Sequence, residues 1–408
     1  MSRRGTWTAA GAAAVLLALS FYALISWLEQ GQLSDVPVYL HYSRLVRGGA
    51  VPYRDFKFEY PPAALPALLL PAYMTWSYAT SFAVLMGACG AGCIAAAGSA
   101  LRAVGAGAVR TWATLLAIGV SPLLLGSLFD TRYDLWPTLL AVGALAAIVR
   151  QRSVVGGILL GLGFAAKLWP AVLLPIAIVH LWRQRGRRGA VAVVAAFVAV
   201  AAACFIPFAV LAPDGLRSMF ADQLDRPLQV ESLGAAVLMA AQHLGMRPLA
   251  TVSTHGAQAL SGRGAGLAAD LSTALEVTVV VAIWIAFARR RNARGESALL
   301  AAAAAVSALV AFDKVLSPQY LIWLAPFVLL VRGGRAIVAG GLLFLALGLT
   351  QTWFPWHYWR LATDHAAPWS WYLLARDLAL VALAAVLSGA GGFWRRRAGS
   401  PDARRAAA

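Results

Sequence analysis

The sequence predicts an all-α protein that crosses a membrane many times. Of its 408 residues, 61% are hydrophobic and 12% are charged, a balance that soluble domains do not carry. The charged residues fall between long apolar runs instead of clustering on one soluble face. We therefore assign the net charge of +17 to the loops of a polytopic membrane protein and expect no nucleic-acid partner.

Apolar segments throughout the chain are candidates for membrane-crossing helices. A crossing needs about 20 apolar residues, and several segments are shorter, so some helices are expected to be broken or to end below the far surface. No signal-peptide cleavage pattern follows the first segment, which is therefore expected to remain as a helix. We predict about twelve transmembrane helices. The candidate segments are residues 8–28, 78–101, 111–126, 135–149, 154–166, 168–182, 191–211, 271–288, 298–312, 320–331, 336–352 and 371–387.

The placement of arginine predicts how the chain is oriented. One set of alternate turns, together with the two chain ends, holds 21 of the 34 Lys and Arg residues. By the positive-inside rule, these turns and both termini are cytoplasmic. We expect residues 1–390 to form a single integral membrane domain and residues 391–408 to form a basic cytoplasmic tail. The expected location is a bacterial cell membrane.

Two long loops, residues 29–77 and 212–270, are expected on the outer face, with an aromatic cap at residues 353–370. A proline-rich stretch at residues 61–71 predicts a short helix at the membrane interface. Residues 233–244 predict a second helix. The remainder of the second loop, around residues 261–264, is expected to be flexible.

Asp35 is the candidate catalytic residue. It follows the first apolar segment as a lone carboxylate, and an aromatic, proline-rich run at residues 56–62 comes soon after it. A carboxylate at the outer membrane surface can act as a general base. Because Pro37 stands two residues later, Asp35 also suits the N-cap of a helix, and the two interpretations are compatible.

Two lysines indicate a cationic site at membrane depth. Lys167 interrupts an almost wholly apolar stretch at residues 154–182, which is too long for one crossing and short for two. The chain is therefore expected to rise, turn at Lys167 and descend, leaving the ammonium group at the head of a cavity. An ionisable group at that depth indicates a functional site, with snorkelling to the interface as the alternative. Lys314 lies in a similar turn, where a structural interaction with Asp313 is the alternative.

Other polar residues of the outer turns leave their roles open. For Arg132, Asp134, Arg226 and Glu231, a solvated loop and a site role fit the sequence equally well. Tyr39 and Tyr60 are aromatic residues that could stack on a sugar ring. The six histidines and three cysteines show no metal-ligand spacing, and no glycine-rich loop resembles a nucleotide cradle, so we expect neither a metal nor a cofactor.

These residue types favour one kind of chemistry. Lysine and arginine near the outer surface suit an anionic group held at membrane depth, such as a lipid-linked phosphate. A phosphate leaving group needs little protonation, so one carboxylate that deprotonates an acceptor hydroxyl would suffice. The pattern therefore predicts sugar transfer from a polyprenyl-phosphate sugar by direct displacement with inversion.

An ordered set of motifs, spread over about residues 30–325, resembles glycosyltransferase family 87, a member of the C-type glycosyltransferase superfamily. The resemblance implies a C-type fold and a polyprenyl-phosphate-mannose-dependent α-mannosyltransferase. It implies that Asp35 is the catalytic carboxylate and that Lys167 and Lys314 lie near the donor phosphate. The motifs are Asp35-x-x-x-Tyr39, Gly48-Gly49-Ala50-Val51-Pro52-Tyr53, Phe58-Glu59-Tyr60-Pro61-Pro62, Lys167-Leu168-Trp169-Pro170, Arg226-Pro227-Leu228-Gln229-Val230-Glu231-Ser232 and Lys314-Val315-Leu316-Ser317-Pro318-Gln319-Tyr320.

One departure from the family pattern bears on mechanism. The usual pair of acids after the first span is replaced by Ser34-Asp35, which favours a metal-free reaction. The candidate substrate-binding residues are Lys167, Lys314, Arg132, Arg226, Glu231, Tyr39, Tyr60 and Gln319.

The expected partners are a polyprenyl-phosphate sugar donor, a glycolipid or glycan acceptor, and membrane lipids. A multi-pass transporter or lipid flippase is the alternative from another class, with the lysines lining a translocation path. The large aromatic outer loops and the absence of an evident inverted repeat argue against it. Within the enzyme class, a pentosyl donor stays open.

Overall fold

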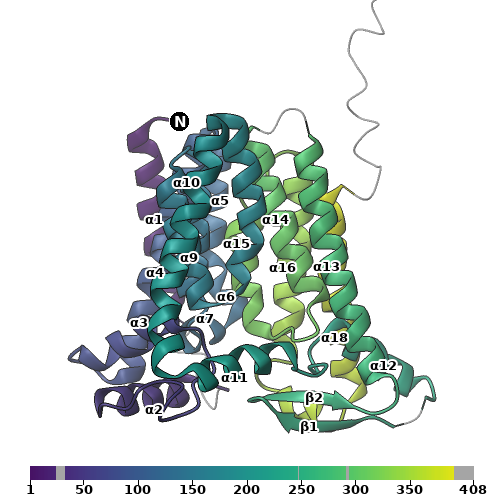
Figure 1. Cartoon of the computed structure of the whole chain (residues 1–408). Helices are drawn as coiled ribbons and strands as arrows, with labels where there is room; N and C mark the ends of the chain where they lie inside the picture. Colours follow the sequence, from purple (N-terminus) through teal and green to yellow (C-terminus); the bar gives the residue numbers. More distant parts are fainter. Residues whose placement is uncertain (24–32, 247, 291–293, 390–408) are drawn as a thin grey trace, which may run out of the picture.

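The computed structural model describes residues 1–23, 33–246, 248–290 and 294–389. Long helices form a bundle, and short elements gather at the end of the bundle that lies away from the N-terminus (Figure 1). We refer to that end as the loop-rich end. The bundle contains α1 (Arg3–Ala23), α4 (Tyr78–Ala103), α5 (Ala108–Val120), α8 (Leu135–Val149), α9 (Ser153–Ala166), α10 (Leu174–Leu211), α13 (Ala265–Arg289), α14 (Gly295–Phe312), α15 (Leu321–Val328), α16 (Gly334–Gln351) and α18 (Ala367–Ser388).

Eight stretches of the described residues are helical, long enough and apolar enough to cross a membrane. One of them, Trp169–Leu211, includes a break at Gly186, where φ is +69° and ψ is −164°. The predicted segments 168–182 and 191–211 fall on the two sides of this break. The predicted crossings on α8, α9 and α15 are helical but shorter, so the count of twelve and the C-type fold stay predictions. The end of the first predicted segment, residues 24–28, lies outside the described residues.

Glycine allows α9 to approach α10 closely. A Cβ atom on Gly157 would lie 2.4 Å from the carbonyl oxygen of Val193, and one on Gly161 would lie 2.7 Å from that of Phe197. Any side chain at either position would clash with the backbone of the neighbouring helix. Small residues of this kind let helices pack in a membrane, where the hydrophobic effect gives no drive between helices. The chain therefore turns back at Lys167 with its two arms in contact, as the sequence predicts.

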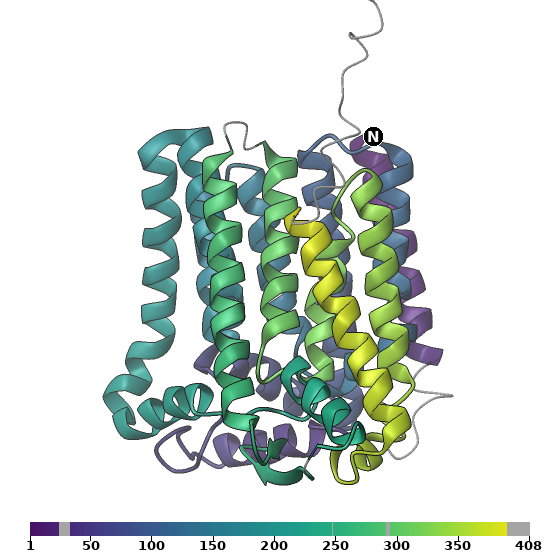
Figure 2. The same ribbon diagram turned by 90° about the vertical axis from the view of Figure 1, so that its right-hand side faces the viewer.

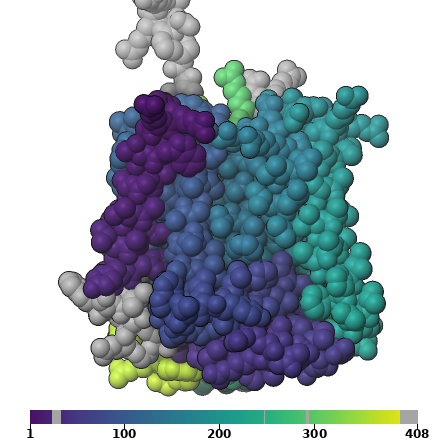
Figure 3. All heavy atoms as spheres, turned by 90° about the vertical axis from the view of Figure 1, so that its left-hand side faces the viewer, coloured from purple at the N-terminus to yellow at the C-terminus, as the bar shows by residue number. Residues whose placement is uncertain are grey.

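The short elements cover the loop-rich end of the bundle (Figures 1 and 2). Helix α2 and the residues that follow it form a continuous layer there (Figure 3). The predicted helix at residues 61–71 is confirmed as three consecutive short pieces, and the one at residues 233–244 is confirmed as α12. The elements are α2 (Val36–Arg47), η2 (Pro62–Ala64), α3 (Leu65–Leu69), η3 (Leu70–Tyr73), α11 (Pro213–Leu224), α12 (Leu233–His243), β1 (Ala250–Thr254), β2 (Ala257–Ser261) and α17 (Tyr358–Ala362).

The fold is predominantly helical, as predicted, but the second outer loop also contains a strand pair that the sequence did not predict. β1 and β2 form an antiparallel hairpin in the register Ala250↔Ser261 to Thr254↔Ala257. β2 pairs further with residues 228–230: Val230 N–H donates to Gln258 O (3.0 Å) and Leu260 N–H donates to Leu228 O (2.8 Å). A partner about 30 residues away in the chain satisfies backbone groups that the local sequence leaves unpaired.

Candidate functional site

A cavity of about 870 Å³ lies where the bundle meets the loop-rich end. Its walls come from α2, α11, α13, α17 and the turn of the hairpin, and from the segments that precede α8 and follow α9 and α14. Eight of the nine predicted site residues line it, which brings together positions more than 280 residues apart. These eight are Asp35, Tyr60, Arg132, Lys167, Arg226, Glu231, Lys314 and Gln319. The ninth, Tyr39, is buried directly behind Asp35.

Asp35 occupies the N-cap position of α2, but its side chain does not cap the helix. The nearby Ser34 Oγ accepts a hydrogen bond from Val36 N–H instead (3.2 Å). The Asp35 carboxylate forms an ion pair with Arg132 through Oδ1 and accepts a hydrogen bond from Tyr39 Oη–H through Oδ2 (3.4 Å). The side chain keeps 33% of its surface exposed, so the carboxylate is oriented by two partners and still accessible from the cavity.

Arg132 and Tyr39 form a buried support behind this carboxylate. The Arg132 side chain is only 9% exposed, so the solvated-loop alternative for it is wrong. Its Nη2 also donates to Leu33 O (3.2 Å), which ties the start of α2 to the bundle. Burial is the main cause that raises the pKa of Tyr39 well above its usual value, so its hydroxyl remains a neutral donor.

Lys167 lies inside the protein and does not snorkel to the interface. Its Nζ forms an ion pair with Asp134 Oδ1 (2.6 Å), and Asp134 is 1% exposed. The same oxygen accepts a hydrogen bond from Trp323 Nε1–H (2.7 Å). The ammonium group also lies 5.0–5.2 Å from the ring centroids of Tyr133, Tyr320 and Trp323, at cation–π distance. Asp134 thus completes the lysine site, and its burial excludes the solvated-loop alternative that the sequence left open for it.

Arg226 and Lys314 face the cavity from two outer turns. Lys314 Nζ donates to Leu224 O (2.9 Å) and forms no direct ion pair with Asp313, although the charges of these two neighbouring residues interact. The Asp313 carboxylate instead accepts from Val315 N–H (2.8 Å). Arg226 Nη2 donates to His255 O (3.1 Å), while its buried Nε has no hydrogen-bond partner within the described chain. Arg226 therefore retains a donor for a ligand.

Glu231 is a second buried carboxylate of the cavity wall. It is 2% exposed, and its Oε2 has no hydrogen-bond partner in the part of the chain that the structure describes. Its backbone oxygen accepts from Arg376 Nη2–H of α18 (2.6 Å), which holds this turn against the bundle. Burial is the main cause that raises the pKa of Glu231 to about 7.

The raised pKa of Glu231 makes stability depend on pH. The folded state holds a proton that the unfolded state has already released, so stability is expected to fall as pH rises from about 4.5 to 7, by about 3 kcal/mol. Glu231→Gln should remove this pH-dependent part of the free energy of unfolding. We expect the thermal midpoint of the variant, relative to wild type, to rise between pH 5 and pH 8 in detergent. An unchanged difference between the two midpoints would show that Glu231 does not titrate there.

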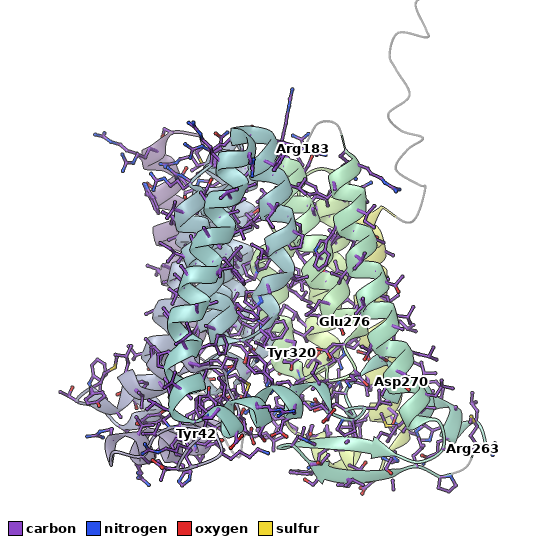
Figure 4. All side chains as sticks on the ribbon, in the orientation of Figure 1. Tyr42, Arg183, Arg263, Asp270, Glu276 and Tyr320 are labelled. Carbon is purple, nitrogen blue, oxygen red and sulfur yellow. The ribbon has the colours of Figure 1, made fainter. Side chains whose placement is uncertain are left out.

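One wall of the cavity is apolar and reaches the surface of the bundle. It is formed by Val277, Val280, Val281 and Trp284 of α13 with Val172 opposite them. Val277 is 56% exposed and Val281 is 37% exposed, so this side faces the outside of the bundle as well as the cavity. Glu276 lies at the same level as Tyr320, far from Arg183 at the other end (Figure 4). An apolar chain could therefore reach the charged residues from the membrane side.

Two histidines near the aromatic cap have partners away from the cavity. His357 stacks on Trp369 (3.9 Å between ring centroids), and His365 Nε2 lies 2.9 Å from Thr251 Oγ1. Neither histidine lines the cavity. Within the described ranges, no three His, Cys, Asp or Glu side chains come together as a metal site. The metal-free reaction stays a prediction.

The chain matches the sequence model of a known protein family. The sequence model described as glycosyltransferase family 87 matches residues 58–318, which is more than half of the chain. No curated protein matches the chain significantly. The matched segment includes Arg132, Lys167, Arg226, Glu231 and Lys314, whereas Asp35, Tyr39 and Gln319 lie outside it.

Proposed function

Because the chain belongs to glycosyltransferase family 87, and is therefore a membrane glycosyltransferase, we propose that its donor is a polyprenyl-phosphate sugar. The sugar is a hexose, with mannose as the first candidate, and it passes to a hydroxyl group with inversion. The observation that carries the proposal is a single cavity with an accessible carboxylate, several cations and an apolar wall open to the membrane side.

Each part of the donor lies where the cavity wall has a matching chemical character. The polyprenyl chain packs on Val277, Val281 and the rest of the apolar wall, where burial of hydrocarbon is favourable. The phosphate lies at Arg226 and Lys314, whose N–H groups match its oxygens. Lys167 adds to the positive field, but Asp134 already neutralises much of its charge. Tyr60 lies on the path towards Asp35 and can contact the sugar.

The reaction is a displacement at the anomeric carbon. The acceptor oxygen attacks that carbon from the side opposite the phosphate, and its proton passes to the Asp35 carboxylate. The bond between the anomeric carbon and the phosphate oxygen breaks, and its electron pair leaves with polyprenyl phosphate. Arg226 and Lys314 stabilise the charge on that leaving group. Arg132 and Tyr39 keep the Asp35 carboxylate oriented, so attack and proton removal occur together.

We further propose that the loop-rich end is extracytoplasmic in a bacterial cell membrane, with both termini in the cytoplasm. The arginine-rich turns that predict this orientation lie near the opposite end, where Arg183 is found (Figure 4). In the test, membranes receive polyprenyl-phosphate [¹⁴C]mannose, and Arg54→Cys, in a chain whose Cys89, Cys93 and Cys204 are replaced by Ala, is probed with an impermeant thiol reagent. Label should reach a glycan or glycolipid, and residue 54 should react from outside. Movement of the donor across proteoliposomes without any transfer would favour a flippase instead.

Lys314→Gln is expected to weaken donor binding. A hydrogen bond to a charged group contributes about 1.5–3 kcal/mol, so the KM for the polyprenyl-phosphate donor should rise about 10- to 100-fold. Lys57→Gln is the matched control, because Lys57 lies on the same end but pairs with Asp222 (2.7 Å) and does not line the cavity. Initial-rate measurements at varied donor concentration separate the two variants. An unchanged donor KM in Lys314→Gln would remove this residue from the phosphate site.

A further inference from the structure

The two-residue turn of the hairpin forms part of the cavity wall. His255 and Gly256 connect β1 to β2 with φ values of +51° and +67°, as a tight hairpin turn requires. Both residues line the cavity, together with Gln258 of β2. The turn also touches the cationic region, because Arg226 Nη2 donates to His255 O (3.1 Å). The hairpin therefore contributes side chains beside the place proposed for the phosphate.

Contacts on both sides fix the position of this hairpin. On one side, β2 pairs with residues 228–230 through the two backbone hydrogen bonds described above. On the other side, Thr251 Oγ1–H donates to Ala362 O (2.5 Å) at the end of α17. Within the turn, Thr254 Oγ1 lies 2.8 Å from His255 Nδ1 and orients the imidazole ring. A ligand would meet a preformed surface rather than a free loop.

Glu59 faces the same turn from the first outer loop. A Cβ atom built on Gly256 would lie 3.5 Å from Glu59 Oε2, so the carboxylate is in contact with the tip of the hairpin. The pKa of Tyr42 is raised to about 12, mainly by burial and further by the negative charges of Glu59 and Asp35. Both carboxylates therefore lie close enough to Tyr42 to interact with it. Glu59 lines the cavity and forms no ion pair with any described residue. It is thus available to a ligand that approaches Asp35.

The chemistry of this region differs from that of the donor site. It offers a carboxylate from Glu59, an imidazole from His255 and amides from Gln223 and Gln258. Such groups donate to and accept from hydroxyls, and a small number of them can orient a sugar in a pocket. None of the apolar wall residues of α13 belongs to this polar set of side chains. The region fits the hydroxyl-bearing ring of a carbohydrate better than a lipid tail or a phosphate.

We propose that Glu59 and the hairpin residues His255 and Gln258 form the binding site for the acceptor sugar. The acceptor is an uncharged glycan group that enters from the aqueous side, while the donor enters from the membrane side. This inference rests on the proposed function, since it assigns the second substrate of the same reaction. The unpaired carboxylate of Glu59 disfavours acidic sugars, because like charges repel at short range.

The inference is tested with soluble probes that carry no lipid tail. Methyl mannobioside serves as a neutral acceptor, and its uronic-acid analogue serves as an acidic one. His255→Ala and Gln258→Ala should each raise the KM for methyl mannobioside by about 10-fold and leave the donor KM unchanged. Val252→Ala is the control, since Val252 lies on β1, is 49% exposed and does not line the cavity. Glu59→Gln should reduce the preference for the neutral over the acidic acceptor.

Direct binding separates this inference from the proposed function. Saturation-transfer NMR measures methyl mannobioside on the purified protein without any transfer reaction. Binding that is lost in His255→Ala and Gln258→Ala but kept in Val252→Ala supports the acceptor site, even if no polyprenyl-phosphate donor is consumed. Normal acceptor KM and binding in both hairpin variants, with transfer intact, would overturn the site and leave the proposed function standing. Binding that requires an octyl chain on the disaccharide would overturn entry from water.

Discussion

Replacing Asp35 by Asn is expected to lower the rate of sugar transfer by about 10²- to 10⁴-fold, the range that a general base contributes. Asn keeps the shape of the side chain and can still accept the hydrogen bond from Tyr39, but it cannot take a proton from the acceptor. The donor phosphate is expected at Arg226 and Lys314, so donor binding should persist. Transfer of radiolabelled sugar and binding of labelled donor are measured in parallel on the variant and the wild type.

Asp55→Asn is the matched control for this experiment. Asp55 lies in the same outer loop, pairs with Arg54 at the surface (2.9 Å) and does not line the cavity. Its variant should transfer sugar at the wild-type rate. Equal losses in the two variants would indicate a disturbed loop instead of a missing base. Full turnover in Asp35→Asn would contradict the catalytic role.

The placement of Asp35 links the family match to the rest of the chain. Asp35 lies before the matched segment of residues 58–318, yet its ion-pair partner Arg132 lies within it. On the other side, Arg376 of α18 lies after the segment and binds the backbone oxygen of Glu231 within it. Residues on both sides of the matched segment therefore complete the cavity. A fragment limited to residues 58–318 would lack both the proposed base and the support for Glu231.

Long apolar runs made most of the helices predictable. Where lipid surrounds a segment, its backbone N–H and C=O groups have to form hydrogen bonds with each other. A long run of apolar residues therefore indicates a helix. The turn at Lys167 was also predictable, because the apolar stretch at residues 154–182 is too long for one crossing and short for two, so the chain has to turn near its single charge. The hairpin was not predictable, since its turn is His255-Gly256 without the usual Asn-Gly signal, and its outer partner is a distant segment.

The site was predictable as a set of residues but not as a set of contacts. Polar residues at the ends of alternate helices must meet at one face, which is why Asp35, Lys167 and Lys314 converge. The ion pairs that these residues form depend on how deeply each side chain is buried and on how its neighbours pack. The hydrophobic periodicity of a sequence contains neither kind of information. Asp134 shows this, because it stands two residues after Arg132 in the chain, yet it turns to Lys167 while Arg132 turns to Asp35. The stack of Trp169, Trp323 and Tyr320 is likewise visible only in three dimensions.

Asp134→Asn is expected to destabilise the protein by about 3–5 kcal/mol, the effect of removing one partner from a buried ion pair. The carboxylate is 1% exposed and is the only anion that the described residues place on Lys167 Nζ, at 2.6 Å. Asn still accepts from Trp323 Nε1–H, so the loss reflects the missing charge. The midpoint of thermal aggregation in detergent is compared for the variant and the wild type.

The double variant Asp134→Asn with Lys167→Met separates stability from catalysis. Removing both charges leaves no unpaired ion in the cavity wall, and Met fills a similar volume among the three aromatic rings, so most of the lost stability should return. Transfer should not return with it, because Lys167 lines the cavity and Met has no N–H group to donate to the phosphate, so the donor KM is expected to be about 10-fold above that of the wild type. A double variant with both wild-type stability and wild-type donor KM would make Lys167 a purely structural residue.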